Sequence, residues 1–152
     1  MEVFRLVREK YALPLSGKGA AIKGARWNSI GVELIYTAMN RSLAMAEVAV
    51  HFTLASLPED YVMMCLEIPD ELPMKRLKIE DLPPDWRQFP HPISTQKLGD
   101  DFVFENKHLG LIIPSVVVQG DYNLLINPKH KGFGQIKLKE MVQFPFDSRI
   151  FK

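Results

Sequence analysis

The stretch GARWNSIGVELIYTAMNRSLAMAEVAVHF, residues 24–52, carries the features from which the fold of this chain is read. A glycine-bounded loop containing Arg26 leads into a strand-like run that ends near Tyr36. An apolar, helix-like segment follows, with Glu47 in its middle. Because a carboxylate removed from water is costly unless it is paired or protonated, we expect compensating groups close to Glu47.

The segment around Glu47 predicts one well-buried helix. Ser42 is the expected N-cap, and the helix is expected to run to about Ser56, before Pro58 ends it. His51 lies four residues after Glu47 on the same face. That face, at helical spacing, also includes Leu43, Val50 and Leu54. Since the helix is apolar nearly all round, Glu47 is not expected to be freely solvated.

Alternating and apolar runs elsewhere predict a sheet. Strands are expected at residues 2–7, 33–38, 61–69, 74–80, 109–119, 123–128 and 135–142. Residues 92–105 are a candidate second helix, and the proline-rich stretch 82–92 predicts an irregular connection. Pro114 interrupts its strand and indicates an edge or a bulge there. The order of elements favours an α+β fold with a mixed, largely antiparallel sheet and flanking helices.

Length and composition indicate a single domain spanning residues 1–152. Hydrophobic residues make up 47% of the chain and charged residues 24%, as in an ordinary globular protein. The 19 basic and 18 acidic residues give a net charge of +1. This balance gives no electrostatic reason to expect direct binding to nucleic acid or to a membrane.

The N-terminus and the number of cysteines indicate the cellular compartment in which the protein is expected. The N-terminus lacks the apolar core of a signal peptide, and no run approaches about 18 apolar residues. The single cysteine, Cys65, cannot form an internal disulfide, which favours a reducing compartment. We therefore expect a cytoplasmic protein in which Cys65 is a buried structural thiol.

The connection from Ala12 to Asn28 contains the first candidate binding residue. So long a loop is usually functional or disordered, and the apolar Ile22 and Trp27 favour an ordered one. Its glycines lack the GxxxxGK[ST] spacing of a P-loop. Arg26 is either a structural arginine stacked on Trp27 or a bidentate clamp for an anion such as phosphate.

Three further side chains each have a functional and a structural interpretation. Glu47 is either a catalytic carboxylate in a semi-apolar pocket or a helix glutamate that pairs with an arginine. Tyr36 is either a stacking surface for a planar ring or a core tyrosine with its hydroxyl at the surface. Ser115 lies in an apolar run without a GxSxG elbow, which by itself favours an ordinary strand serine.

The histidines add little chemistry by pattern alone. His51, His91, His108 and His130 lack the spacing of metal ligands, so no metal site is expected. A hydrolase that uses Ser115 and His130 would need a nucleophile–base contact that spacing cannot establish.

Taken in order, these motifs resemble the RES domain family. The resemblance runs from Phe4 to Phe151 and rests on the segments FRLV, LSGKGAAIKGARWNSIG, ELIYTA, SLAMAEVAVHF, LIIPSVVV, NLLINPKH and FPFDSRIF. The combination of GxRWNxxG, a tyrosine, a helical glutamate and a PS strand is specific to that family, although no single element is. The resemblance implies an ADP-ribosyltransferase-like fold and an activity that consumes NAD or transfers ADP-ribose from it.

The resemblance also assigns site residues by position. It implies catalytic roles for Glu47, Arg26 and Tyr36, and substrate binding by Arg5, Arg26, Tyr36, Ser115 and Asn127. Where the family usually has a second glycine this chain has Ala25, whose methyl group is tolerated only at negative φ. The segment GDDFVFENKH, residues 99–108, also departs from the family pattern, in what is expected to be the pocket wall beside Ser115.

The implied chemistry accounts for a carboxylate inside the helix. Cleavage of the nicotinamide–ribose bond builds positive charge on the ribose, which a shielded carboxylate such as Glu47 stabilises. Tyr36 would stack on the nicotinamide, and Ser115 would bind the ligand or orient Glu47. Arg5 and Arg26 would bind the pyrophosphate of NAD or pair with Glu47 in the empty site. Water, phosphate or a protein side chain remain possible acceptors.

RES proteins are typically toxins of type II toxin–antitoxin pairs, which implies a partner as well. We expect a cognate antitoxin with a helix-turn-helix DNA-binding part that covers the NAD cleft, so that any DNA contact comes from the partner. The competing class is a non-enzymatic interaction module, in which Glu47 and Arg26 form a structural ion pair.

Overall fold

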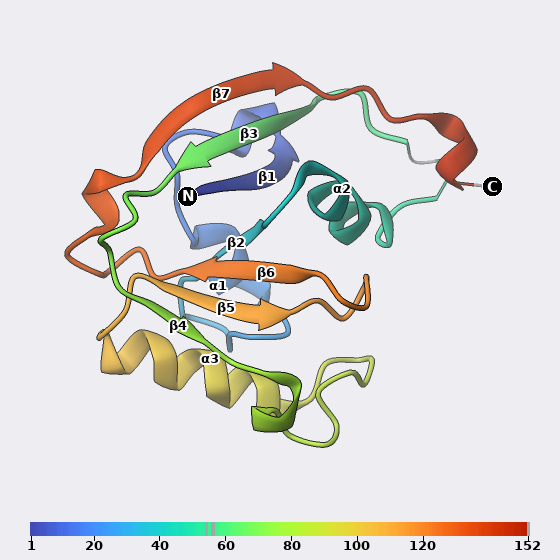
Figure 1. The fold of residues 1–152 in the computed structure, drawn as a ribbon. Coiled ribbons are helices and arrows are strands. Elements are labelled where there is room, and N and C mark those ends of the chain that lie inside the picture. The colour runs from blue at the N-terminus through green and yellow to red at the C-terminus, as the bar shows by residue number, and fades with distance from the viewer. Residues whose placement is uncertain (54, 56, 152) are drawn as a thin grey trace.

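The strands form one twisted sheet in the computed structural model, which describes residues 1–53, 55 and 57–151 (Figure 1). The strand order is β4-β5-β6-β2-β1-β3-β7, and every neighbouring pair is antiparallel except β4 with β5. The strands are β1 (Glu2–Arg8), β2 (Ile35–Ala38), β3 (Tyr61–Glu67), β4 (Met74–Arg76), β5 (Gly110–Pro114), β6 (Tyr122–Ile126) and β7 (Lys137–Gln143).

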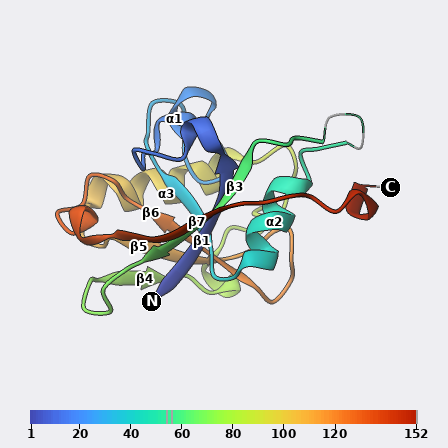
Figure 2. The same cartoon turned by 90° about the horizontal axis from the view of Figure 1, so that it is seen from above.

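Within the described residues three α-helices flank this sheet: α1 (Lys18–Lys23), α2 (Arg41–Ala49) and α3 (Ile93–Glu105). Helix α3 lies beneath the half of the sheet formed by β4, β5 and β6, whereas α2 packs against β1 and β2. Viewed from above, α1 and α2 lie on opposite sides of β1 (Figure 2). The predicted α+β fold with a largely antiparallel sheet is confirmed, and so is the helix expected within residues 92–105.

Separate apolar clusters attach α2 and α3 to the sheet. Between α3 and the sheet, Phe102 packs in a cluster with Leu125 of β6. Between α2 and the sheet, Leu43 packs with Phe4 of β1 and Cys65 of β3. The Cys65 thiol is buried, as predicted, and burial raises its pKa. A further cluster, which includes Val3 of β1, Ile35 of β2 and Leu124 of β6, joins the two halves of the sheet.

The half of the sheet formed by β4, β5, β6 and β2 pairs with the half formed by β1, β3 and β7 at a single register position. Over the described residues, β1 and β2 share one register pair, Phe4 with Ala38, whereas β1 pairs with β3 along its whole length. β2 in turn pairs with β6 from Ile35 to Ala38. On one side of the Phe4–Ala38 pair the strands therefore separate, which leaves room for side chains between the two halves.

Helix α2 differs from its prediction at both ends. Its N-cap is Asn40 and not Ser42, because the extended backbone of Asn40 lets its Oδ1 accept a hydrogen bond from the Leu43 amide at 2.8 Å. The helix ends at Ala49, several residues before the predicted Ser56, which lies outside the described residues together with Leu54. Beyond the helix, Phe52 packs edge-to-face on Tyr61.

Other expectations also need correction or refinement. The predicted loop from Ala12 to Asn28 contains α1, which the glycine-rich sequence did not indicate. β5 is an inner strand, but β4 ends opposite Ile112, so Pro114 has a strand partner on one side only. No helix among the described residues combines the length and the apolar character needed to cross a membrane.

Candidate active site

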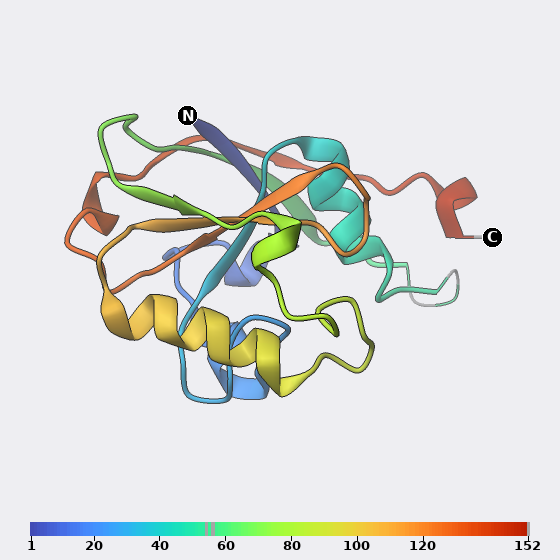
Figure 3. The same cartoon turned by 60° about the horizontal axis from the view of Figure 1, so that its bottom comes forward.

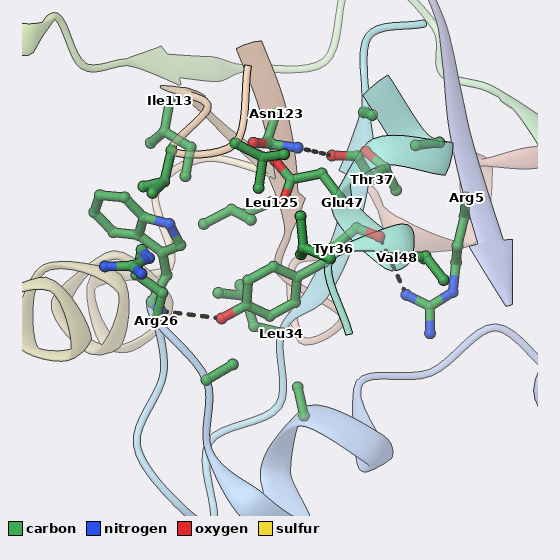
Figure 4. A pocket seen from close by; sticks show the side chains of 18 of the residues that line it. Arg5, Arg26, Leu34, Tyr36, Thr37, Glu47, Val48, Ile113, Asn123 and Leu125 are labelled. Atoms are coloured by element: carbon green, nitrogen blue, oxygen red, sulfur yellow. Dashed lines mark hydrogen bonds between the residues drawn. The ribbon is translucent and has the colours of Figure 1, made fainter. Parts of the chain in front are cut away.

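A cavity of about 1090 Å³ lies where β1 and β2 separate. Its walls come from these strands, α1, α2, the loop 24–27, the segment 87–91 and the neighbouring ends of β5 and β6. Four predicted site residues line it: Arg5, Arg26, Tyr36 and Glu47. Figure 4 shows the Tyr36 ring between Arg26 and Arg5. The cavity is large for a small-molecule site, which suits an elongated ligand.

Arg5 occupies the gap between the two halves of the sheet. Since β2 has left β1 at this level, the carbonyl of Tyr36 lacks a strand partner on that side, and Arg5 Nη1 donates to it at 3.3 Å (Figure 4). The Nε of Arg5 is buried without a hydrogen-bond partner. Burial lowers the pKa of this guanidinium. Arg5 thus offers an unsatisfied buried donor beside the cavity.

The loop before β2 is held by a hydrogen-bond network centred on Asn28. Its side-chain amide donates to the carbonyls of Ala20, Ser29 and Val32. Its Oδ1 accepts from the Tyr36 hydroxyl at 2.6 Å, and that hydroxyl accepts from the Trp27 amide at 3.1 Å. The tyrosine hydroxyl is therefore not at the surface but fixes the loop from inside.

Helix α3 clamps the same loop from the other side. The side chain of Gln96 donates to the carbonyls of Ala25 and Asn28, and Asp100 accepts from Ser29. Gly99 lies so close that a Cβ built on it would come within 1.6 Å of the Trp27 carbonyl oxygen. The atypical segment 99–108 therefore begins against the Arg26 loop and not beside Ser115. Ala25 has a negative φ, the condition expected for its methyl group.

Arg26 uses one end of its guanidinium to hold a second segment. Its Nη1 donates to the carbonyls of Trp86 and Gln88, each at 2.8 Å. Burial lowers the pKa of Arg26, while the negative charge of Glu47 and the Tyr36 phenol act to raise it. Among the described residues neither Arg5 nor Arg26 forms an ion pair with Glu47, so the alternative in which Arg26 pairs with Glu47 is wrong.

Glu47 has a different partner, the serine that follows β5. Ser115 Oγ donates to Glu47 Oε1 at 2.8 Å. The same Oγ accepts from the amides of Val117 and Val118, both at 3.0 Å. The turn after Pro114 thereby fixes the serine, and the serine fixes the carboxylate. The half-buried Glu47 is neither freely solvated nor neutralised by a cation.

Two sequence candidates lie elsewhere. Asn127 is outside the cavity, where its side chain bonds the Val103 carbonyl and Asn106 after α3. His130 follows the end of β6 and accepts a hydrogen bond from the Gly132 amide. That end of β6 pairs with Gly110, at the start of β5. Ser115 follows the other end of β5, so a Ser115–His130 pair is not formed.

Several cavity residues were missed by the sequence interpretation. Arg87, Phe89 and His91 come from the proline-rich segment, and Asn123 comes from β6. The sequence hint for the first three was an arginine and an aromatic residue among prolines. Because this connection has no periodicity, the sequence does not indicate which way these side chains point. Among the described residues that line the cavity there are thus three arginines and a single carboxylate, Glu47, which favours an anionic ligand. Within the described part of the chain, no cluster of three or more His, Cys, Asp or Glu side chains could hold a metal.

Comparison with known proteins identifies relatives over nearly the whole chain. The model of the RES domain matches residues 2–147. A protein named Toxin Res from Yersinia enterocolitica is 36% identical over 152 residues, or 99% of both chains. A protein named Prs ADP-ribosylating toxin from a Sphingobium species is 33% identical over 141 residues, covering 91% of this chain and 87% of its own.

The fold also has a solved counterpart. A chain in the crystal structure of the M. tuberculosis MbcT–MbcA toxin–antitoxin complex superimposes with a TM-score of 0.76 over 99% of this chain and 86% of its own. At 21% identity, this likeness concerns the fold. The family model covers residues 2–147, and the Yersinia relative is 36% identical over nearly the whole chain, so the chain belongs to the RES domain family.

Proposed function

We propose that this protein is the toxin of a toxin–antitoxin pair and that it cleaves the nicotinamide–ribose bond of NAD. The observation that carries the proposal is a half-buried carboxylate, Glu47, held by Ser115 in a largely apolar cavity whose lining also includes Arg5, Arg26 and Arg87. The relatives named Toxin Res and Prs ADP-ribosylating toxin support the same reading.

The proposed chemistry follows from charge. As the nicotinamide departs, the ribose takes on oxocarbenium character, and a fixed carboxylate beside it lowers the free energy of that state. Glu47 is suited to this because its orientation is set before the ligand arrives. Among the described residues its carboxylate forms no ion pair that would compete with the ribose, since Arg5 and Arg26 bond carbonyls.

The other residues would bind and orient the dinucleotide. The Tyr36 ring lies between the two arginines and offers a face to the nicotinamide (Figure 4). The unsatisfied Nε of Arg5 and the donors of Arg26 that do not bond the loop would serve the polar groups of the ligand. Asn127 takes no part in this proposal because it lies outside the cavity.

The acceptor defines the reaction. Attack by water gives a glycohydrolase and attack by phosphate gives a phosphorylase, and we propose one of these. The arginines of the cavity support attack by phosphate, because they would attract a small anion. Transfer of ADP-ribose to a protein is the alternative, favoured by the name of the Sphingobium relative.

The proposal is tested by incubating purified protein with NAD, with and without phosphate, and resolving the products. Nicotinamide release together with ADP-ribose indicates hydrolysis, and release with ADP-ribose 1-phosphate indicates phosphorolysis. Glu47→Gln should lower turnover by about 100-fold or more while the fold is kept. The matched control is Glu105→Gln, at the exposed end of α3. Unchanged turnover in Glu47→Gln contradicts the assignment.

We further propose a cognate antitoxin that covers the cavity and carries a helix-turn-helix part of its own. Expression of the chain alone should deplete NAD and arrest growth, and co-expression of the neighbouring gene should reverse both effects. The non-enzymatic alternative predicts neither effect, and it has lost the Glu47–Arg26 ion pair on which it depended.

A further inference from the structure

The segment 86–91 forms one rim of the cavity and is held there by Arg26. The two carbonyls that accept from Arg26 Nη1 belong to Trp86 and Gln88, the neighbours of Arg87. The Arg87 guanidinium lies 4.8 Å from the centre of the Trp86 ring, which supports it from below. Arg87 is thus fixed both through its flanking carbonyls and through its side chain. In Figures 1 and 3 this rim lies on the same side of the molecule as the C-terminal end of α2.

Two more residues of this segment face the cavity. Phe89 is 85% exposed although it is a large aromatic side chain, and it lines the cavity together with His91. An exposed aromatic ring next to a cation, at the mouth of a pocket, is the arrangement that binds a nucleobase and its phosphates. Gly19 of α1 also lines the cavity, and it leaves open space where a side chain would stand.

The rest of the cavity is unlike this rim. Around Arg5 the walls are the apolar side chains of Phe4 and Leu6 of β1 and Val48 of α2, and Glu47 lies between the two ends. A ligand that puts its reacting ribose at Glu47 and its small ring toward Arg5 must direct its remaining half toward Arg26 and the rim.

We infer that Arg87 and Phe89 form the subsite for the adenylate half of a dinucleotide, with Arg26 as the residue that positions them. Phe89 stacks on the purine, and Arg87 contacts the phosphates. The inference rests on the proposed function for the identity of the ligand. It changes the part assigned to Arg26, which acts on the ligand chiefly by holding the carbonyls of Trp86 and Gln88.

The test compares a ligand that has the adenylate half with one that lacks it. Binding of ADP-ribose is measured by calorimetry, and turnover is measured with NAD and with nicotinamide mononucleotide. Arg87→Ala and Phe89→Ala should each weaken ADP-ribose binding roughly tenfold and raise KM for NAD to the same extent. Turnover of the mononucleotide should change less than about twofold. Arg149→Ala and Phe104→Ala, which replace exposed residues outside the cavity, are the matched controls.

Positioning by Arg26 has its own readout. Arg26→Ala should increase amide hydrogen exchange in residues 86–91, and the double variant Arg26→Ala/Arg87→Ala should bind ADP-ribose no more weakly than Arg26→Ala alone. Unchanged exchange, or additive losses of affinity, would overturn this part of the inference.

The subsite and the proposed reaction can fail separately. ADP-ribose affinity that is unaffected by Arg87→Ala and Phe89→Ala, or no ADP-ribose binding by the native protein, refutes the subsite. Binding that both variants weaken, in a protein that does not turn over NAD, upholds the subsite and refutes the reaction.

Discussion

Ser115 Oγ donates a hydrogen bond to Glu47 Oε1 at 2.8 Å across 68 positions of sequence. The bond joins the end of β5 to the middle of α2 and orients the single carboxylate of the cavity lining. The serine hydroxyl also accepts hydrogen bonds from two backbone amides, so its own position is determined by the turn that follows β5. This pair connects the fold of the sheet to the geometry of the site.

Removing the serine hydroxyl should therefore affect turnover through Glu47. Ser115→Ala is expected to lower kcat for NAD by about tenfold to a hundredfold with little change in KM, because the carboxylate loses its orientation. In the Glu47→Gln background the same substitution should have almost no further effect on kcat. Steady-state kinetics of the two single variants and the double variant test this, and equal losses in both backgrounds would contradict it.

Gly99 is expected to be essential for the position of the Arg26 loop. In Gly99→Ala the new methyl group must displace the Trp27 carbonyl, which is backbone and cannot rotate away. We expect a loss of about 2 kcal/mol or more in the free energy of unfolding, despite the better helix propensity of alanine. Urea unfolding measures this against Gly134→Ala, where the methyl group meets open space. Equal stabilities of the two variants would refute the close contact.

The buried phenol of Tyr36 predicts a loss of stability in alkali. Burial raises the pKa of Tyr36 above its ordinary value of 10.0, so the neutral phenol is favoured in the folded state. Its contribution to stability is complete below pH 10 and falls as the pH rises toward the folded-state pKa.

The free energy of unfolding should accordingly decline above about pH 10, and Tyr36→Phe should reduce the slope of that decline. Part of the slope will remain in the variant, because burial also raises the pKa of Tyr61. At neutral pH Tyr36→Phe should itself be less stable, since Asn28 Oδ1 and the Trp27 amide lose their partner. Denaturant titrations at a series of pH values decide this, and parallel curves for the two proteins would contradict the burial of the phenol.

The N-cap of α2 gives a prediction that distinguishes Asn40, the observed cap, from Ser42, the cap expected from the sequence. Asn40→Ala should lower the free energy of unfolding by about 1 kcal/mol, because the Leu43 amide loses its acceptor. Ser42→Ala should change it much less, since the exposed Ser42 lies inside the first turn and caps nothing. Thermal unfolding of both variants is the measurement, and a larger loss in Ser42→Ala would restore the original assignment.

The sequence was a good guide wherever burial follows a local period. Alternation in β1 and the apolar run of β3 predicted strands, and the buried Cys65 followed from its neighbours. The helix around Glu47 was found for the same reason. Its ends were not, because Asn40 and Ser42 are equally good caps by residue type, and only the backbone path from β2 into α2 places Asn40 in the extended conformation.

The site followed the sequence less closely. The resemblance to the family brought Arg5, Arg26, Tyr36, Glu47 and Ser115 to attention, and these residues do gather around one cavity or touch a residue that lines it. It also suggested Asn127, which follows the end of β6 and bonds Asn106 outside the cavity. Arg87 and Phe89 lie in an irregular connection, where no periodicity indicates which way a side chain points.

By itself the sequence determined most strands, the helices around Glu47 and within residues 92–105, the family pattern and the presence of a shielded carboxylate, since each depends on residues close together in the chain. The tertiary structure decided the partner of each polar group. Glu47 bonds Ser115, and Arg26 bonds the carbonyls of Trp86 and Gln88. Arg5 bonds the Tyr36 carbonyl of β2, which has no strand partner on the side of β1. Those partners are 31 to 68 positions apart in sequence. The physical reason is that hydrogen bonding requires a particular approach of two segments, and that approach is set by how the two halves of the sheet diverge.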